Sequence, residues 1–347
     1  MISRIAILTA ALAWSVPAFA WWDEGHMKIA ALAYEQLTPA AREEANRLIR
    51  LNPDYQDWVA AIPNSPDHQP KDVDRYTFIR AAAWADDIKT YAAYQNASSG
   101  GKDREKDEAT TPTAGRNIGY RDLLIHGYWH FKDIGFRLDG KEPPAPDPVD
   151  AVTQIKLFTA ALPRSAGQPD DVRSYDLTWL LHLVGDIHQP LHAVTLYDER
   201  FTKKHAEAKP KPEPDTGDRG GNEIMVVPAN GVPVNLHAYW DSVFGGYSTV
   251  FGALFDTFNA KVVDGVVVNT SKIEPAPAEK VAIVDPAAWA TESFELAKKY
   301  AYADPVLSGE KPQLTREYET GARKVAEQQV ALAAARLANL LNTALGQ

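Results

Sequence analysis

Residues 179–194, which read WLLHLVGDIHQPLHAV, are apolar almost throughout and yet contain three histidines and an aspartate. We expect such a segment to be buried, and burying a carboxylate or an imidazole without a partner is costly. His182 and Asp186 are four residues apart, so on a helix they project side by side from one face. Pro190 has no backbone donor and predicts a kink or the end of that helix, with His192 just beyond it.

A bound metal ion is the partner that this cluster predicts. Imidazole and carboxylate ligands without a thiolate suit a divalent ion, and zinc is the leading candidate. The alternative is an ordinary core helix whose polar side chains are satisfied by hydrogen bonds. That alternative is the commoner one for a lone histidine, but a cluster of four such residues in one apolar run favours the metal.

The first 20 residues have the features of a secretory signal. One arginine is followed by a short apolar run, residues 5–14, and then by an A-x-A cleavage pattern at 18–20. Cleavage after Ala20 would make Trp21 the first residue and direct the chain to the periplasm or the medium. The run is too short to span a bilayer, so we expect no membrane anchor; the alternative is an N-terminal anchor helix that is retained.

Charge and composition exclude some classes of function. The 347-residue chain has a formal net charge of −10 and no cysteine. Zinc ligands must therefore be His, Asp, Glu or backbone groups. An acidic chain does not offer the broad basic surface that attracts nucleic acid, so a phosphate substrate would need a local positive centre such as bound metal. The chain also has no G-x-S-x-G elbow and no glycine-rich nucleotide-binding pattern.

Helical spacing of apolar residues recurs along the chain, and Thr38 with Pro39 reads as an N-cap and first helical residue. The helices expected besides that of the central segment lie at 26–37, 40–51, 75–94, 149–161, 286–301 and 313–343. Segments rich in Gly, Pro, Ser and charge predict exposed loops at 95–117, 139–148 and 198–222.

The segment 222–236 predicts a short β-hairpin, because NEIMVV and VPVNL flank the turn sequence PANG. The hairpin leads to a second pair four residues apart, His237 and Asp241. We therefore expect a mainly α fold: a single helical domain over 21–347, after a signal peptide at 1–20, with a short β-hairpin and long surface loops.

The ordered set of motifs resembles one known family, the trinuclear-zinc nucleases typified by nucleases S-one and P-one. Zinc-dependent bacterial phospholipase C is a more distant relative. The resemblance extends from residue 21 over essentially the rest of the chain. It rests on Trp21 with His26, WAD at 84–86, HFKD at 130–133, HLVGDIHQPLH at 182–192, GGN at 220–222 and NLHAYWD at 235–241.

The resemblance implies a helical fold of the phospholipase C and nuclease P-one type that holds three Zn²⁺ ions. One ion would be held by Asp86, His130, His182 and Asp186; a second by Asp186 as a bridge, His26, and the amino nitrogen and carbonyl oxygen of Trp21; the third by His192, His237 and Asp241.

The resemblance also implies a substrate and residues that contact it. Lys89 and Asn222 would lie near the scissile phosphate, Phe131 would stack on a base, and Asp133 would hydrogen-bond the base edge. The catalytic set is Asp86, which could orient the attacking water, with Lys89 and Asn222. The implied activity is secreted, zinc-dependent hydrolysis of single-stranded DNA and RNA to 5′-phosphorylated products by a zinc-activated water, with 3′-nucleotidase activity. Its partners would be these substrates, with no obligate protein partner.

Two other functions compete with the nuclease. Zinc-dependent phospholipase C is the alternative enzyme, but its third metal set ends in a glutamate where this chain has Asp241, and it lacks the HFKD pair. The third possibility is a non-enzymatic zinc-binding protein, although nine ligands for three ions leave open positions that closed structural sites do not have.

Several other polar residues have plainer interpretations. We expect His126 to pack or to support a ligand, and His188 either to face solvent or to support a ligand. Asp87 could replace Asp86, but the WAD spacing favours Asp86. The remaining histidines, in polar loops, are expected to be bystanders: His68 and His205.

Overall fold

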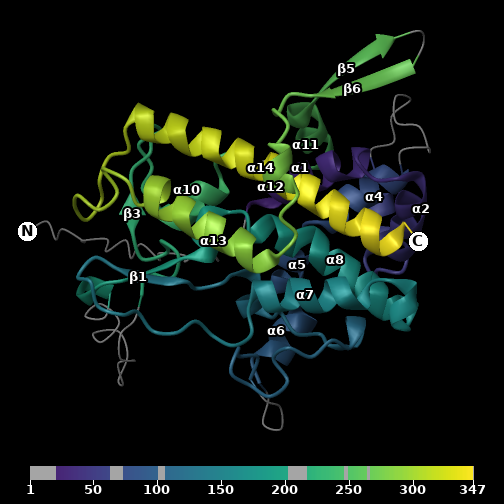
Figure 1. Ribbon diagram of the computed structural model, residues 1–347, viewed down its shortest axis with the longest axis horizontal. Helices are drawn as coiled ribbons and strands as arrows, with labels where there is room; N and C mark the ends of the chain where they lie inside the picture. The colour runs from purple at the N-terminus through teal and green to yellow at the C-terminus, as the bar shows by residue number, and fades with distance from the viewer. Residues whose placement is uncertain are drawn as a thin grey trace, which may run out of the picture.

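The structure, a computed structural model, is built mainly from helices, and the residues that it describes form three small two-stranded sheets (Figure 1). It describes residues 21–62, 73–100, 106–201, 217–245, 249–263 and 266–346. None of the helices in these ranges combines the length and apolar character that crossing a bilayer requires. The mainly helical fold class expected from the sequence is confirmed. The proposed signal segment and the histidines at 68 and 205 lie outside the described residues.

The helices up to the central one are α1 (Asp23–Glu35), α2 (Pro39–Ile49), α3 (Tyr55–Ala60), α4 (Val73–Ala81), α5 (Trp84–Asp87), α6 (Ala92–Ser98), α7 (Ala151–Ala161) and α8 (Asp170–Asp186). Those that follow are α10 (Leu236–Asp241), α11 (Val250–Thr257), α12 (Ala278–Val281), α13 (Pro286–Leu296) and α14 (Arg316–Leu345). The sheets are parallel β1 (Gly135–Arg137) with β2 (Thr195–Tyr197), antiparallel β3 (Met225–Val226) with β4 (Val234–Asn235), and antiparallel β5 (Phe258–Val263) with β6 (Val266–Ser271).

Helix α8 is the central element, and nearly all of its side chains are buried. It is surrounded by other elements inside the core and packs against α7, α2, α14, α1 and α5. The rings of Trp84, Trp129 and Tyr175 surround Trp179 at centroid distances of 5.0 to 6.1 Å. The helix ends at Asp186, before the proline that was expected to terminate it.

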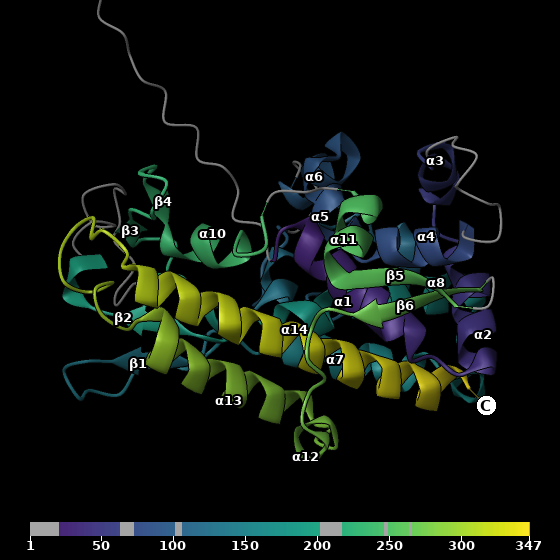
Figure 2. The same cartoon turned by 90° about the horizontal axis from the view of Figure 1, so that it is seen from above.

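Most of the expected elements are confirmed. Thr38 caps α2 by accepting a hydrogen bond from the amide of Ala41. Helices α1, α7, α13 and α14 lie where helical spacing predicted them, and the β3–β4 pair is the predicted hairpin. Helices α3, α11 and α12 and the β5–β6 hairpin were not predicted. Figure 2 shows the long helix α14 and, beside it, α13 running along one side of the molecule.

The prediction of one continuous helix over 75–94 is wrong, because the chain breaks after α4 and again before α6. The break turns the carbonyl group of Ala82 toward α8, where it accepts a hydrogen bond of 2.7 Å from Nδ1 of His182. The loop expected from residue 95 begins only after Ser98. Two side chains of that loop, Ala109 and Ala114, are buried rather than exposed.

Candidate metal centre

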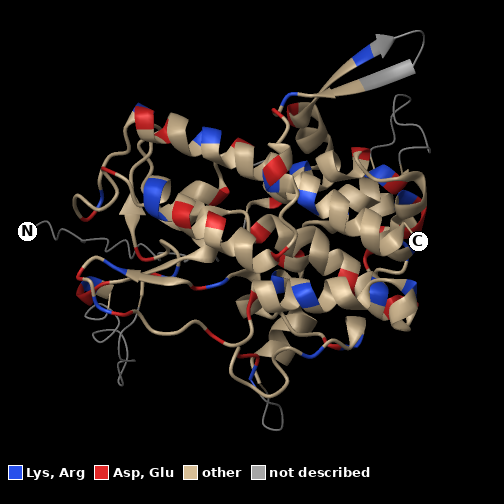
Figure 3. Ribbon diagram, in the orientation of Figure 1, with Lys and Arg blue, Asp and Glu red and all other residues tan. Residues whose placement is uncertain are grey.

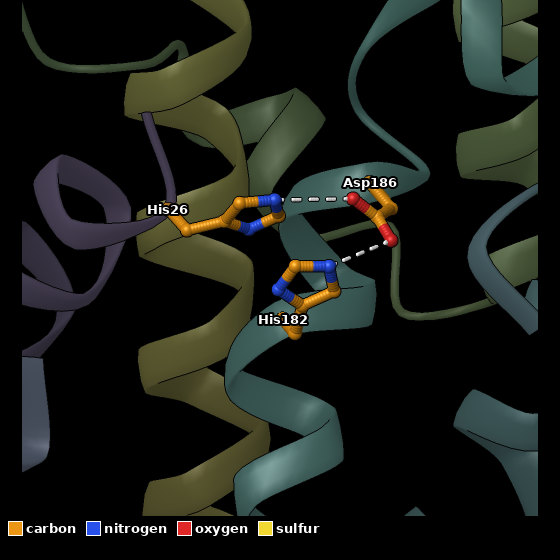
Figure 4. Close-up of side chains that lie close together, drawn as sticks. All are labelled: His26, His182 and Asp186. Atoms are coloured by element: carbon orange, nitrogen blue, oxygen red, sulfur yellow. Dashed lines mark ion pairs between the residues drawn. The ribbon is translucent and has the colours of Figure 1, made fainter. Parts of the chain in front are cut away.

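The C-terminal turn of α8 brings three candidate ligands together (Figure 4). His182 and Asp186, one turn apart, have Nε2 and Oδ2 3.3 Å apart. The other carboxylate oxygen, Oδ1, lies 3.2 Å from Nε2 of His26, which α1 supplies. The two imidazole rings stack, with centroids 3.7 Å apart and planes 16° apart. All three side chains are buried. One carboxylate thus directs its two oxygens to different histidines.

A second group shares His182 and lies on the other side of the same carboxylate. His130 approaches Oδ2 of Asp186 with its Nδ1 at 2.9 Å, and the same nitrogen is 3.1 Å from Nε2 of His182. Asp86, from α5, places Oδ1 3.7 Å from His182 Nε2 and 4.0 Å from His130 Nδ1. Asp86, His130 and His182 are therefore close enough for one ion.

The third group, His192, His237 and Asp241, comes from the turn after α8 and from α10. The two Nε2 atoms are 3.1 Å apart. The Asp241 oxygens lie 3.5 Å from His237 Nε2 and 3.9 Å from His192 Nε2. Gln189 donates a hydrogen bond of 2.7 Å to Oδ1 of Asp241. His237 and Asp241, which are four residues apart in the sequence, thus both contribute to this group.

Hydrogen bonds to backbone carbonyl groups determine which ring nitrogen carries the lone pair in three of the histidines. Ala82, His130 and Gly220 each accept a 2.7 Å hydrogen bond from Nδ1 of one ligand histidine: His182, His192 and His237, respectively. A carbonyl can only accept, so Nδ1 must carry the proton and Nε2 the lone pair. Each Nε2 therefore points into its group as a metal ligand would.

Trp21 and the residue after it are hydrogen-bonded to α8 and to α10. Its indole Nε1 donates to the carbonyl of Gly185 at 3.1 Å, and the amide of Trp22 donates to the carbonyl of Asp241 at 3.2 Å. The Trp21 side chain is fully buried. This segment is thereby fixed beside both α8 and α10, close to His26.

Glycine at position 185 permits the close approach of α1 to α8. A Cβ atom there would lie 2.8 Å from Nδ1 of His26, a separation that real side chains do not tolerate. A larger residue would push His26 away from Asp186. Sequence reasoning placed Gly185 inside the HLVGDIHQPLH motif but assigned it no role.

The residues of these groups fit divalent metal ions. Oδ2 of Asp86 and Oδ2 of Asp241 are buried without a hydrogen-bond partner among the described residues, which is costly for an acceptor. Asp186 and Asp241 are the last residues of α8 and α10, where the helix dipole disfavours negative charge. Burial also raises the pKa of Asp241 well above its ordinary value. A cation would satisfy these acceptors and offset both effects.

Two of the candidate ligands are electrically neutral at neutral pH. Burial lowers the pKa of His130 and of His237 to about 3. Neutral imidazole is the form that binds metal, so neither ring must lose a proton first.

The residues expected near the phosphate are placed differently. Lys89 approaches Asp86 at the first two groups, with Nζ 2.6 Å from its Oδ1. Asn222 instead donates from its side-chain amide to the carbonyl of Arg219, 2.8 Å away in its own loop.

The loop of Asn222 is held by a residue that sequence reasoning missed, Asp218. This buried carboxylate accepts hydrogen bonds from the amides of Leu196 and Gly221 and from the hydroxyl of Tyr302. The loop in turn presents the Gly220 carbonyl that orients His237. A lone aspartate two residues before a Gly-Gly pair gave no signal of this role.

The HFKD segment is tied to the third group. The backbone of His192 accepts from the amide of Lys132 at 2.8 Å, and its ring donates to His130 as described above. Phe131 is half-buried beside His130 and packs against the main core. Thr195 donates to Oδ1 of Asp133 at 2.6 Å, and burial raises the pKa of Asp133 to about 6.

His126 and Asp87 lie outside the metal groups, in agreement with the interpretation favoured from the sequence. His126 is buried between Asp107 and Asp122, at 3.2 and 3.0 Å, and stacks on Trp129. It therefore supports the loop before the HFKD segment. Asp87 pairs with Arg80 at 2.8 Å, whereas its neighbour Asp86 faces the metal groups.

His188 is buried rather than exposed, so the solvent-facing alternative is wrong. Its Nδ1 donates to the carbonyl of Val184, and its Nε2 accepts from Arg336 of α14 at 2.9 Å. Burial and the Arg336 charge lower the pKa of His188 to about 3. The ring therefore links α8 to α14 only in its neutral form.

The His188 pKa predicts acid sensitivity. Between pH 6.5 and pH 3 the unfolded chain binds a proton that the folded chain does not, so folding stability falls as pH falls through that window. We expect His188→Gln, which keeps a donor and an acceptor, to reduce the loss of unfolding free energy between pH 7 and pH 4 by about 3 kcal/mol. Denaturant titrations at both pH values test this. An equal loss in variant and wild type would contradict it.

Comparisons with known proteins show which proteins this chain is similar to. The model of a family described as S1/P1 Nuclease matches residues 21–346. The chain is similar to two proteins of Arabidopsis thaliana, Endonuclease 3 with 29% identity and Endonuclease 4 with 27% identity, each over 195 residues. The first match covers 53% of this chain and 58% of that relative, and the second covers 53% and 56%. The chain thus spans little more than half the length of these curated relatives.

Proposed function

Because the chain belongs to the S1/P1 nuclease family, we propose that it is a zinc-dependent endonuclease that hydrolyses single-stranded DNA and RNA to 5′-phosphorylated products. We include 3′-nucleotidase activity in the proposal. The observation that carries it is Asp186, whose two oxygens face different histidines within three buried groups that could hold metal. A carboxylate divided in this way suits two neighbouring ions better than one.

We propose three Zn²⁺ ions, because five imidazoles and three carboxylates without any thiolate suit this ion. The ligands would be the three groups together with the main-chain atoms of Trp21. When bound, such ions polarise a water for attack and neutralise charge on the phosphate.

The protein side chains would orient the reacting groups. Lys89, held at Asp86, would place a positive charge beside an equatorial phosphate oxygen. Asp86 has one oxygen toward Lys89 and one without a partner among the described residues, so besides binding metal it could orient the attacking water. Asn222 would have to exchange its bond to Arg219 for a bond to the phosphate.

Base recognition would come from the HFKD segment. Phe131 follows His130 directly, so a base stacked on its ring would lie beside the second metal group, that of Asp86, His130 and His182. A base paired in a duplex must be extracted first, which costs a few kcal/mol, whereas stacking supplies about 1–3 kcal/mol per base. We therefore expect single strands to be cut much faster than duplexes.

Phe131→Ala tests this role. Cleavage of single-stranded DNA and of 3′-mononucleotides should fall about tenfold to a hundredfold, because one stacking contact is lost. Hydrolysis of a base-free phosphodiester should fall far less, and zinc content should stay near that of the wild type. Equal losses on both substrate types would mean that Phe131 only positions His130.

The decisive assay for the activity compares four substrates side by side. Single-stranded DNA, RNA, a 3′-mononucleotide and phosphatidylcholine are offered to the zinc-loaded protein and to protein treated with a chelator. We expect cleavage of the first three, with activity lost on chelation and restored by zinc. Hydrolysis of phosphatidylcholine alone would favour a phospholipase C instead.

We also propose that the protein works outside the cytoplasm, after removal of residues 1–20. The support is the A-x-A pattern at 18–20. The role proposed for Trp21 as a ligand would also require a free amino group at that residue. N-terminal sequencing of protein recovered from the periplasm or medium tests this; an N-terminus other than Trp21 would contradict it.

A further inference from the structure

A pair of exposed aromatic side chains lies on α11, outside the metal centre. Phe251 and Phe255, one helical turn apart, are 58% and 66% exposed. Their rings lie 6.4 Å apart between centroids, with planes within 21° of parallel. Large apolar side chains exposed together are a mark of interaction sites.

The pair borders a cavity of about 590 Å³ between α11, α4 and the β5–β6 hairpin. Within the described part of the chain, its lining contains two cations and two amides but no carboxylate. The polar and aromatic lining residues other than the pair are Arg75, Tyr76, Phe258, Asn259, Asn269 and Lys272. Of the two cations, Arg75 is already paired with Glu35 at 2.8 Å, and Asp256 of α11 pairs with Lys28, so Lys272 carries the positive charge that a phosphate would meet here.

The cations lie beside aromatic rings. Lys272 has its Nζ 4.9 Å from the ring centroid of Phe255, and it donates to the carbonyl of the same residue at 2.6 Å. The guanidinium of Arg75 lies 5.4 Å from the centroid of Phe258. A ring that stacks on Phe255 would therefore bring its attached phosphate near a fixed positive charge.

This lining matches single-stranded nucleic acid more closely than an apolar partner. Aromatic rings offer stacking platforms for bases, amides can bond base edges, and cations can neutralise phosphates. A lipid or apolar peptide would account for the phenylalanines but not for the amides and cations. In Figure 3 the described part of the hairpin shows blue and no red, although the chain as a whole is acidic.

The surface is fixed to the helix that carries His26. Lys28 of α1 contacts Asp256 of α11 at 3.3 Å and Glu24 at 2.9 Å, and this cluster is largely buried. Figures 1 and 2 both show α11 beside α1. Nucleic acid bound at α11 would thus be held one helix away from the metal groups.

We propose that α11 and the β5–β6 hairpin form a second docking surface for single-stranded nucleic acid, separate from Phe131, that binds nucleotides remote from the cleaved bond. This inference rests on the proposed nuclease function and adds a consequence. Strands long enough to reach both sites should bind more tightly than short ones.

The test measures binding of phosphorothioate oligothymidylates of increasing length to the zinc-loaded protein by fluorescence anisotropy. Phe255→Leu keeps apolar bulk but removes the stacking ring, so affinity for long strands should fall about 5-fold to 100-fold. The dependence of affinity on length should flatten. Val284→Ala, which shortens an apolar side chain that is 76% exposed on another face, should bind long strands like the wild type.

Salt dependence gives a second readout. Lys272→Gln should reduce the slope of log affinity against log salt concentration by about 0.7, the value for one phosphate contact with a single strand. Lys272→Arg should restore the slope. Thermal midpoints and zinc contents close to those of the wild type would show that these exposed substitutions leave the fold intact.

Several outcomes would overturn the proposal. One is oligonucleotide binding by Phe255→Leu that equals binding by the wild type, and another is an equal loss of binding in Val284→Ala. Loss of binding to anionic phosphatidylglycerol vesicles in Phe255→Leu, with oligonucleotide binding intact, would assign the surface to lipid. Wild-type protein that binds long strands but cleaves none would refute the nuclease function and not the docking surface. Cleavage by the wild type together with unchanged binding in Phe255→Leu and in Lys272→Gln would refute the docking surface alone.

Discussion

Asp186→Asn should empty two of the three proposed metal positions and lower the proposed nuclease activity by about a thousandfold or more. The aspartate directs one oxygen to His26 and the other to His182 and His130. Asparagine keeps a single carbonyl oxygen and replaces the other with an amide that cannot bind metal. Each bound ion supplies several kcal/mol of charge stabilisation, and about 1.4 kcal/mol is tenfold in rate.

Elemental analysis of purified protein provides the measurement, with His237→Ala as the matched control. That substitution removes a ligand of the third group only, so it should cost one ion and leave the other two in place. Wild-type protein with a single zinc would contradict the three-ion arrangement. An Asp186→Asn protein with the full complement would show that this carboxylate does not bridge.

A residue or tag placed before Trp21 should remove the ion that we assign to His26 and abolish most of the activity. Trp21 is held by its indole bond to Gly185 and by the bond from the next amide to Asp241. The main chain is therefore positioned, and only a free amino group can add its nitrogen as a ligand. An extension converts that amine into an amide, which has no lone pair to give.

The experiment compares processed protein, N-terminally extended protein, and processed protein tagged at the C-terminus. Zinc content and cleavage of single-stranded DNA should fall only in the extended form. Equal zinc and equal activity in all three would exclude Trp21 from the metal site. A loss in the C-terminally tagged form as well would point to an effect of the tag itself.

Local sequence was sufficient to predict the positions of some candidate ligands but not of others. The i, i+4 pairs His182–Asp186 and His237–Asp241 could be predicted because helical spacing places such residues on one face. The position of Asp86 came only from its WAD motif, since the helix expected over 75–94 is broken in the structure. Single-segment periodicity does not detect that break, where the carbonyl of Ala82 accepts a hydrogen bond from His182 on another helix.

What the sequence by itself determined is the helical class, the buried central segment, and the identity of the candidate ligands. Those properties depend on composition and on spacing along one segment. Only the tertiary structure decided that Asp186 faces two sets of histidines, that Gly185 makes room for His26, and that Asp218 holds the loop of Gly220. Each of these contacts joins side chains or carbonyl groups from segments far apart in the chain. The spacing of residues along one segment does not predict such contacts.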